Sequence, residues 1–406
     1  MIIRELYLKK IRPFYELNLI KVISGVRRCG KSILLSQIMN EIKAKTNEKH
    51  IIFFDAEDIG LRKYKNDPEG FYSLVSSSIV DSDKYYIFLD EIQYIEDFEI
   101  VLASLQAKVS CSIFVTGSCS NLLKGKLATR LTGRTVDFVI MPFTYKETIQ
   151  YLETKGIQAT EKTFTDYLMW GGFPLRLDTQ ETGNARKLMN DLFQGIIARD
   201  IFDNGLSVSR TSFLNVTSFI LSLSGNTISP SSIAGNMSFY EKEKISRQTL
   251  YDYLRILENA YLVTPIQRYD ILGKKALTTM QKYYAVDPSF ITLNKNGRET
   301  SSLSFSLETV ICNELIARGY EVYIGKAGKA KVDFIACQEG KKCYLQVAYD
   351  LKGEETQTRE FGAFLPIKDT CPRFIITNEA YDYSREGINH INAIDFLTGK
   401  KDLFFS

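Results

Sequence analysis

Residues 21–33 read KVISGVRRCGKSI, and the fold of the N-terminal part follows from this stretch. An apolar run typical of a buried strand ends at Ser24, and Ile33 to Ile42 repeats apolar residues with helical spacing. Between the two, Gly25 to Ser32 matches the pattern G-x-x-x-x-G-K-[ST]. Glycines in such a loop let backbone amides turn toward phosphate oxygens. A strand, this loop and a helix in succession therefore predict a phosphate-binding loop.

The positions of this loop have separate expected roles. The Lys31 ammonium would neutralise charge on the outer phosphates, the Ser32 hydroxyl would ligate Mg²⁺, and the helix behind them would add its positive dipole end. A chance match in a glycine-containing turn is the alternative, which the flanking strand and helix disfavour. The expected nucleotide-binding residues are Gly25, Val26, Arg27, Arg28, Cys29, Gly30, Lys31, Ser32 and Ile33.

Two carboxylates complete the expected site. Tyr85 to Leu89 reads as a strand, and Asp90 and Glu91 follow it directly. A carboxylate at a strand end beside the loop can hold magnesium, which makes Asp90 an expected metal ligand together with Ser32. Glu91 faces differently and would polarise the attacking water as general base. The alternative role for Glu91 is that of a solvated acidic loop residue.

A further strand, Ser112 to Val115, ends in a polar segment. We expect Ser118 to orient the attacking water there. Thr116 and Asn121 are also candidates for this task, and a turn built on hydrogen bonds from Ser and Asn side chains to the backbone fits equally well.

Two arginines follow this strand, Arg130 and Arg134. An arginine on the flank of the domain could stabilise transition-state charge on the phosphates of a neighbouring subunit, and we assign this catalytic role to Arg134. Activity would then require a homo-oligomer. Surface salt bridges are the alternative.

The composition is that of a soluble globular protein with more than one domain. At 406 residues the chain is too long for one ordinary core, and 45% hydrophobic with 24% charged residues predict that most of it folds. A net charge of +3 does not indicate nucleic acid, and the absence of a long apolar stretch predicts a cytoplasmic protein without membrane contact. Seven cysteines without a C-x-x-C pair, and only two histidines, argue against a structural zinc site.

The chain is expected to contain four segments in sequence. Residues 1–143 alternate short apolar strands with helices, which predicts an α/β domain with a parallel sheet and a site at its carboxyl edge. Residues 144–203 read as helices broken by Gly171 to Pro174 and are expected to form a helical lid. Residues 204–290 carry helix signals and then a hairpin, and residues 300–406 return to mixed helices and strands.

Residues 204–290 have the layout of a winged helix. Ile228 to Ala234 reads as a short capped helix and Ile245 to Leu257 as an amphipathic helix capped by Ser246, before two strands. Polar side chains on the second helix could enter a DNA groove, and basic side chains on the wing could contact phosphates. They are Arg247, Gln248 and Tyr251 on the helix and Arg268, Lys274 and Lys275 on the wing. Protein contacts are the alternative use, because fold alone does not decide function.

These motifs together resemble the bacterial and archaeal AAA-type ATPases that pair an N-terminal P-loop domain with a C-terminal domain of unknown function, DUF4143. The resemblance covers nearly the whole chain. It rests on Val22 to Ser32, Ile87 to Gln93, Phe114 to Ser118, Leu131 to Arg134, Gly171 to Pro174 and Ala198 to Ile201. The family implies ATP rather than GTP, a P-loop NTPase core of the AAA+ type with a helical lid, and a sensor role for the polar end of the Ser112 strand. It implies no known substrate.

Residues 300–406 resemble the restriction-endonuclease-like fold. The resemblance rests on a helix with Glu308 and Glu314, followed by Asp333 and Gln346 on later strands. In active members of that fold such side chains bind metal, and a lysine two positions after the second strand residue assists the nucleophile.

Ala348 stands where that lysine would be. We therefore expect a degenerate nuclease scaffold without nuclease activity. A lysine that reaches the site from elsewhere, such as Lys331 or Lys342, would overturn this expectation.

The sequence therefore predicts an ATP-hydrolysing AAA-type enzyme whose nucleotide state moves the lid against the later modules. Its cofactors would be ATP and Mg²⁺, with DNA as a possible partner of the winged helix. The expected catalytic residues are Lys31, Glu91, Ser118 and Arg134. A DNA-binding regulator in which hydrolysis is incidental is the main alternative. A small-molecule kinase shares the phosphate loop but would need an acceptor-binding lid in place of the later modules.

Overall fold

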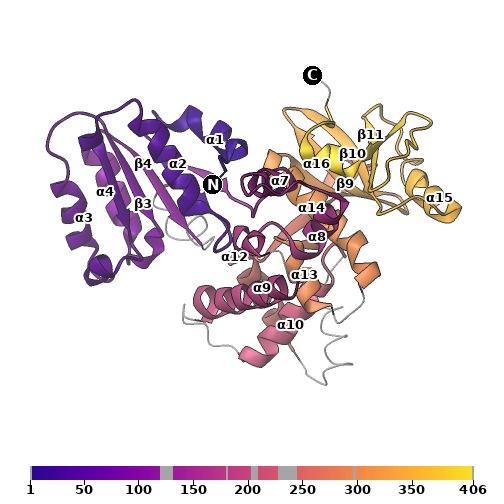
Figure 1. Ribbon diagram of the computed structural model, residues 1–406, viewed down its shortest axis with the longest axis horizontal. Helices are drawn as coiled ribbons and strands as arrows, with labels where there is room; N and C mark the ends of the chain where they lie inside the picture. The colour runs from indigo at the N-terminus through magenta and orange to yellow at the C-terminus, as the bar shows by residue number, and fades with distance from the viewer. Residues whose placement is uncertain are drawn as a thin grey trace. The chain divides into compact units, whose positions relative to one another are not determined.

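The computed structural model describes residues 2–118, 131–179, 182–202, 209–226, 245–295 and 299–404. Contacts between residues divide the chain into two compact units, drawn in Figure 1. Unit 1 is Met1–Met141 with Asn259–Tyr261, and unit 2 is Pro142–Glu258 with Leu262–Ser406. Unit 2 thus holds most of the segments expected as lid, winged helix and C-terminal domain, and the boundaries between these segments stay predictions.

Unit 1 is built on a five-stranded sheet in the order β2-β3-β4-β1-β5. All neighbouring strands in this sheet are parallel. The strands are β1 (Ile20–Ser24), β2 (Ile51–Asp55), β3 (Tyr85–Asp90), β4 (Cys111–Gly117) and β5 (Thr135–Val139). Strands β1, β3 and β4 are buried along their whole lengths, as expected for a parallel sheet covered on both faces. The predicted parallel α/β architecture is confirmed.

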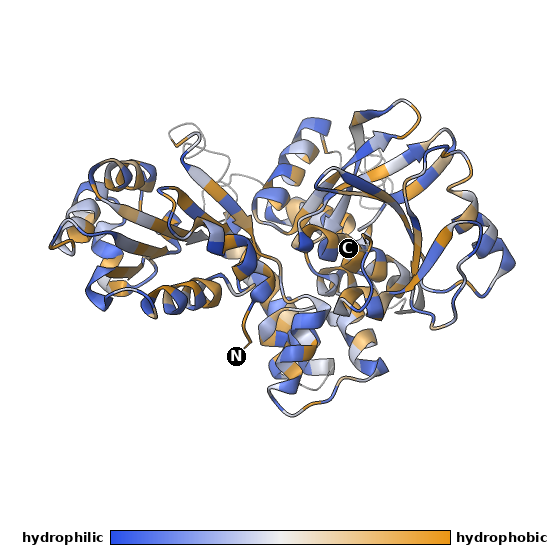
Figure 2. Ribbon diagram, turned by 90° about the horizontal axis from the view of Figure 1, so that it is seen from above, coloured by the Kyte–Doolittle hydropathy of each residue, from blue (hydrophilic) through white to orange (hydrophobic). Residues whose placement is uncertain are grey.

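Helices cover both faces of this sheet. Helix α2 (Lys31–Lys43) lies on one side of the strands, and α3 (Pro68–Ser77) and α4 (Phe98–Lys108) lie on the other (Figure 1). Phe71 of α3 and Leu102 of α4 belong to the same buried cluster as the strand residues. Figure 2 shows the hydrophobic colour concentrated on the strands of this unit. A further helix, α1 (Glu5–Ile11), precedes the first strand.

The sequence pattern does not predict β5, although it completes the sheet next to β1. An edge strand pairs on one side only, so it needs no continuous apolar run. In β5, polar Thr135 and Asp137 alternate with apolar residues, and the strand is only partly buried. This mixed composition gave no strand signal.

Unit 2 begins with helices, as the sequence predicts for residues 144–203. They are α7 (Tyr145–Glu153), α8 (Glu161–Trp170) and α9 (Thr182–Ile196), and α10 (Arg210–Ser222) follows them. Thr144 and Glu147 form a reciprocal capping box at the start of α7, which satisfies two backbone amides there.

Two glycines between α8 and α9, Gly171 and Gly172, lie where the side chain of any other residue would clash. A Cβ atom on Gly171, whose φ is +69°, would lie 1.8 Å from Oδ1 of Asp287. A Cβ atom on Gly172 would lie 1.9 Å from the carbonyl oxygen of Phe143. The Gly172 amide donates to Oδ2 of Asp287 at 2.9 Å. The pair therefore lets the backbone close on a buried carboxylate.

The helix expected over Ile245 to Leu257 is α12 (Arg247–Asn259). Ser246 caps it by accepting a 3.0 Å hydrogen bond from the Thr249 amide. The short helix expected over residues 228–234 lies outside the described residues. Strands β6 (Val263–Asp270) and β7 (Lys275–Ala285) form the expected antiparallel hairpin. This hairpin also pairs with a third strand, β8 (Glu321–Ala327), and so belongs to a larger sheet.

That larger sheet has seven strands in the order β12-β11-β10-β9-β8-β6-β7. Its other strands are β9 (Ala330–Gln338), β10 (Lys341–Val347), β11 (Arg373–Thr377) and β12 (Ile388–Asn392). The helices of this region are α13 (Pro288–Asn294), α14 (Glu299–Arg318), α15 (Glu354–Gly362) and α16 (Ala393–Thr398). Leu345 belongs to one buried cluster and the adjacent Tyr344 to another, so the sheet is buried on both faces.

Candidate functional site

The phosphate loop, Gly25 to Ser32, joins the carboxyl end of β1 to the first turn of α2. Gly25 has a φ of +147° and Gly30 a φ of +101°, which L residues rarely adopt. A Cβ atom on Gly25 would also lie 2.2 Å from the carbonyl oxygen of Ile140. The loop conformation therefore requires both glycines of the motif.

The Lys31 side chain lies on the inside of this loop and is 3% exposed. Its Nζ donates to the carbonyl oxygens of Gly25 and Val26 at 3.2 Å each and lies 3.7 Å from Oε1 of Glu91. No side chain among the described residues caps the N-terminus of α2, so its first amides are left for a ligand. An ammonium and open helix amides together are the groups that hold phosphate.

Asp90 and Glu91 lie at the carboxyl end of β3, beside the end of β4. The Thr116 hydroxyl, on β4, donates to Oδ1 of Asp90 and accepts a 2.8 Å hydrogen bond from the Glu91 amide. Glu91 has a φ of +48°, a left-handed conformation that non-glycine residues adopt only where neighbours hold them. Thr116 therefore holds the Asp90 carboxylate and the Glu91 backbone. The role of Ser118 in orienting the water stays a prediction.

Gln93 connects Glu91 to Ser118 and was not recognised from the sequence as a site residue. Its Nε2 donates to Oε2 of Glu91, and to Oγ of Ser118 at 3.4 Å. Its Oε1 is buried without a hydrogen-bond donor among the described residues. A buried amide oxygen normally has a donor, so this atom is open to a donor that enters with a ligand. Its position two residues after Glu91 was the available sequence signal.

Arg4 supports the phosphate loop from the N-terminal segment and is fully buried. Its Nη1 donates to the carbonyl oxygen of Cys29 at 2.9 Å, and its Nη2 donates to that of Met141 at 3.0 Å. Its guanidinium carbon also lies 4.6 Å from the centre of the Tyr7 ring. One side chain thus joins the loop to the last residue of the main segment of unit 1. A lone arginine before a helix carries no sequence signature, so only the structure reveals this contact.

The other expected nucleotide-binding residues differ in their burial and in their contacts. Cys29 is fully buried, and burial raises the pKa of its thiol, so it can face a nucleotide only through its backbone. Arg27 forms a 2.8 Å ion pair with Glu57. The exposed members of the set are Arg28, Ser32 and Ile33. The Ser32 side chain, in the first turn of α2, is therefore accessible to a metal ion.

Arg134 is exposed and immediately precedes β5. Because the start of β5 pairs with Ile20 at the start of β1, Arg134 lies at the amino edge of the sheet, opposite the phosphate loop. The strand between them spans roughly 16 Å. The structure therefore does not bring Arg134 to the Lys31 site of its own unit. The alternative arginine, Arg130, and Asn121 lie outside the described residues.

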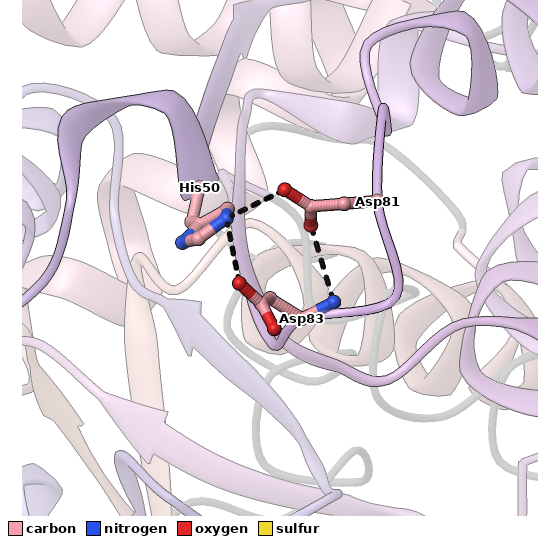
Figure 3. A group of neighbouring side chains, drawn as sticks. All are labelled: His50, Asp81 and Asp83. Atoms are coloured by element: carbon pink, nitrogen blue, oxygen red, sulfur yellow. Dashed lines mark hydrogen bonds and ion pairs between the residues drawn. The ribbon is translucent and has the colours of Figure 1, made fainter.

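A second charged group also lies at the amino edge of the sheet, drawn in Figure 3. Nε2 of His50 lies 3.2 Å from Oδ2 of Asp81 and 3.5 Å from Oδ2 of Asp83. These atoms are close enough together to share a metal ion. Oδ2 of Asp81 also accepts a 2.9 Å hydrogen bond from the Lys49 ammonium. The bonds from Lys49 and His50 lower the pKa of Asp81. We interpret the group as an ion-pair cluster that ties the start of β2 to the start of β3.

The groups at the carboxyl edge fit a magnesium-bound nucleoside triphosphate by their chemistry. Asp90 and Ser32 offer the hard oxygen ligands that Mg²⁺ prefers. Lys31 and the amides of α2 offer the positive charge and the donors that phosphates require. Oε1 of Gln93, which accepts no hydrogen bond from the described residues, adds an acceptor beside Glu91.

Comparisons with known proteins agree with this geometry. A family model described as an AAA domain matches residues 17–149, which confirms the predicted P-loop NTPase fold of unit 1. A second model, a domain of unknown function (DUF8612), matches residues 161–299. The DUF4143 domain, expected over residues 300–406, is not confirmed, and the DUF8612 model matches the segment before it. No helix among the described residues is long and apolar enough to cross a membrane.

Similar chains span almost the whole length of this one. An uncharacterized protein of Haemophilus influenzae is 33% identical over 405 residues, 98% of each chain. The uncharacterized protein MJ1544 of Methanocaldococcus jannaschii is 27% identical over 396 residues, 93% of this chain and 85% of its own. Among solved structures, the Walker-type ATPase of Pyrococcus abyssi covers 72% of this chain and 96% of its own at 16% identity, with a TM-score of 0.49.

Proposed function

The chain belongs to one family with the uncharacterized protein of Haemophilus influenzae and contains an AAA domain, and we propose that it binds ATP with Mg²⁺ and hydrolyses it. The observation that carries the proposal is the convergence of Lys31 and Glu91, whose charged atoms lie 3.7 Å apart at the carboxyl edge of the sheet. In a parallel α/β sheet, ligands bind at this edge. A bound phosphate would replace the backbone carbonyls of Gly25 and Val26 as the hydrogen-bond acceptor of the Lys31 ammonium.

The residues of the site divide the work of phosphoryl transfer. Ser32 and Asp90 would hold the Mg²⁺, which neutralises charge on the phosphates when it is bound. Lys31 and the amides of the phosphate loop orient the outer phosphates for attack. Glu91 orients the water molecule and accepts its proton as general base.

Hydrogen bonds around Glu91 support this role. Thr116 holds the Glu91 backbone through the amide, and Gln93 holds its carboxylate at Oε2. With one carboxylate oxygen bound to an amide, the other is directed toward Lys31 and the phosphates. Ser118, linked through Gln93, would complete the orientation of the water.

Replacement of the base tests the proposal. Glu91→Gln removes the proton acceptor but keeps the shape of the side chain, so we expect ATP to bind and turnover to fall by about 100-fold or more. Binding is measured by calorimetry with Mg²⁺ present, and turnover by phosphate release. The matched control is Glu96→Gln, an exposed carboxylate on the same loop, which should change neither quantity.

The two measurements separate the possible failures. If the wild-type protein binds no ATP, the proposed function is wrong as a whole. If Glu91→Gln turns ATP over at the wild-type rate, Glu91 is not the base, although nucleotide binding stands.

Arg134 acts, in our proposal, on a neighbouring copy of the chain, since it lies at the far edge of its own sheet. Turnover per chain should then rise with protein concentration as copies associate. Arg134→Ala should lower turnover without lowering ATP affinity of the isolated chain. Mixing Arg134→Ala with Glu91→Gln chains should restore part of the activity, because each supplies what the other lacks.

A second candidate function is that of an ATP-switched DNA-binding regulator. Exposed side chains on one face of α12 favour it. They are Arg247, Gln248, Tyr251 and Arg255. Basic and amide side chains on one helix face suit a DNA groove. Fluorescence anisotropy with duplex DNA, with and without ATP, distinguishes the two functions. DNA affinity that does not change with ATP would remove this candidate.

A further inference from the structure

Several helices of unit 2 end in the same backbone conformation, and most of them use glycine for it. Helices α7, α14 and α16 are each followed by a glycine in the left-handed region, at Gly156, Gly319 and Gly399. The amide after each glycine donates to the carbonyl oxygen five residues before it. Glycine is common at this position because it has no Cβ atom that would make the conformation unfavourable.

Tyr261 takes the place of this glycine after α12. The Leu262 amide donates to the carbonyl oxygen of Leu257 at 2.9 Å, as at the end of the other three helices, and Tyr261 has a φ of +54°. A bulky residue adopts this conformation only at a cost in free energy, and it persists where the surroundings hold it. The reason for a tyrosine at this position must therefore lie in its side chain.

The Tyr261 side chain reaches the residue that precedes the phosphate loop. Its hydroxyl donates to Oγ of Ser24 at 2.8 Å. Ser24 is fully buried, ends β1 and is followed directly by Gly25. The Ser24 carbonyl oxygen accepts a 2.7 Å hydrogen bond from the Ile140 amide, so the sheet holds its backbone. Tyr261 is thus bonded to the fixed end of the phosphate loop.

The chain connects Tyr261 directly to α12. The segment Asn259–Tyr261 belongs to unit 1, whereas the residues before and after it belong to unit 2. Asn259 is also the last residue of α12. A displacement of Tyr261 together with Ser24 therefore acts on the last turn of α12 through covalent bonds.

A contact inside the phosphate loop supplies the event that would cause such a displacement. The Lys31 ammonium donates to the carbonyl oxygen of Gly25 at 3.2 Å. A phosphate that binds Lys31 replaces this acceptor and releases the Gly25 carbonyl, next to Ser24. A ligand changes a conformation only through contacts that differ between two states. The bond between Lys31 and Gly25 is a contact of this kind.

We propose that Tyr261 is a positioning residue that couples nucleotide binding at the phosphate loop to the last turn of α12. The proposal rests on the proposed function, since ATP is the ligand that replaces the contact between Lys31 and Gly25. The Tyr261 hydroxyl follows Ser24, and its backbone transmits the displacement to the helix. The nucleotide site thereby acts on the helix that carries exposed basic side chains.

The coupling is measured by hydrogen exchange of α12 with and without a non-hydrolysable ATP analogue and Mg²⁺. In the wild-type protein, the analogue should change exchange in residues 254–259 at least about threefold. Tyr261→Phe removes only the hydroxyl and should abolish most of this change, as should Ser24→Ala. The double variant should lose no more than either single one, because both remove the same bond. The control is Tyr251→Phe on the exposed face of the same helix, which should retain the change.

Tyr261→Gly separates the coupling from the shape of the helix end. Glycine suits the left-handed conformation, so the Leu262 amide should exchange as slowly as in the wild type or more slowly. The response of α12 to the analogue should nevertheless be lost. If Tyr261→Gly or Tyr261→Phe keeps the full response, the side chain is not the link and the proposal is wrong. Circular dichroism and melting temperature verify that each variant is folded.

Failure of the coupling can be told from failure of the proposed function. If calorimetry detects binding of the analogue but exchange in α12 of the wild type does not respond, ATP binding stands and the coupling is wrong. If the analogue does not bind, the proposed function is wrong, and the Tyr261 link is judged without nucleotide. Ser24→Ala should then still speed exchange in the last turn of α12 severalfold, because Tyr261 loses its acceptor. Unchanged exchange in that variant would overturn the link as well.

Discussion

Units 1 and 2 each place a buried lysine beside carboxylates, but they assemble this arrangement differently. In unit 1, Lys31 belongs to a continuous motif and meets a single carboxylate, that of Glu91 at 3.7 Å. In unit 2, Lys282 meets two carboxylates, Glu308 and Asp333, that come from a helix and another strand. The first arrangement is predicted from two short motifs, residues 25–32 and 85–91, whereas the second is recognised only once the sheet has formed.

The two lysines also differ in how far their charge is already balanced. Burial lowers the pKa of Lys282, but Glu308 and Asp333 outweigh this effect and raise it overall. Lys31 has one carboxylate and two backbone carbonyls instead. The charge of Lys282 is thus balanced within unit 2, whereas that of Lys31 is less balanced and suits a phosphate ligand. Four predictions test this contrast.

The largest effect is expected from Lys31→Ala. Loss of a buried ammonium that meets phosphate should weaken ATP binding by about 2–5 kcal/mol, or roughly 30-fold to several thousand-fold. Calorimetry with Mg²⁺ measures it, and Lys43→Ala on the outer part of the same helix is the control. An affinity within about twofold of wild type would contradict the assignment of the phosphate loop.

Lys282→Met should chiefly lower stability. It leaves two carboxylates without their shared cation, so the free energy of unfolding should fall by about 3 kcal/mol. Trp170, the single tryptophan, lies in α8 of unit 2, so its fluorescence follows unfolding of this unit in urea. Adding Glu308→Gln to Lys282→Met should recover part of the loss. If the double variant is no more stable than the single one, Lys282 does not serve to balance these carboxylates.

Arg4→Met tests whether the phosphate loop depends on distant contacts, as the Lys282 site does. It leaves the buried carbonyl oxygens of Cys29 and Met141 without this donor, at a cost of about 1–3 kcal/mol. We expect faster hydrogen exchange in residues 25–32 and weaker ATP binding, with partial recovery in Arg4→Lys. The exposed Arg62→Met is the control. Unchanged exchange in the loop would show that the motif is sufficient by itself.

The last prediction, whose effect per pH unit is small, concerns Lys21, a buried lysine of unit 1 whose hydrogen-bond partners are neutral oxygens. They are the carbonyl oxygens of Leu17 and Leu19 and the hydroxyl of Ser112, at 2.6–3.0 Å. Burial, with a smaller contribution from Lys84, lowers the pKa of Lys21 from 10.5 to about 7.

The sign of its pH dependence follows from that shift. Between pH 7 and 10.5 the unfolded chain binds this proton and the folded chain releases it, so stability rises with pH in this window. Relative to that of Lys21→Met, the free energy of unfolding of wild-type unit 1 should rise by at most about 1.4 kcal/mol per pH unit. Hydrogen exchange of β1 at several pH values measures the difference. A difference that is constant across the window would show that Lys21 stays charged throughout.

The sequence predicted the framework of unit 1 because its signals are local. A glycine loop between an apolar strand and a helix implies the carboxyl edge of a parallel sheet, and Asp90 and Glu91 follow a strand of the same kind. Thr116, Gln93 and Arg4 could not be ranked in this way. Their importance depends on which atoms face each other across strands, and Arg4 reaches the loop from 25 residues away in the sequence.

The sequence predicted less of unit 2. The hairpin of β6 and β7 was recognised, but not its pairing with β8, because parallel pairing leaves no turn signal between the strands. For the same reason, the sequence did not predict that Lys282 lies near Glu308 and Asp333. A lysine on β7 approaches Asp333 on β9 only because the sheet brings β7, β6, β8 and β9 together in that order.

The position of β1 in its sheet also has a consequence for protein synthesis. β1 lies between β4 and β5, although the chain reaches them only about a hundred residues later. A nascent chain on the ribosome therefore carries the entire nucleotide motif long before the strands that shape it have emerged. ATP capture should begin abruptly once residue 139 has left the exit tunnel, and chaperones would meet the uncovered β1 until then.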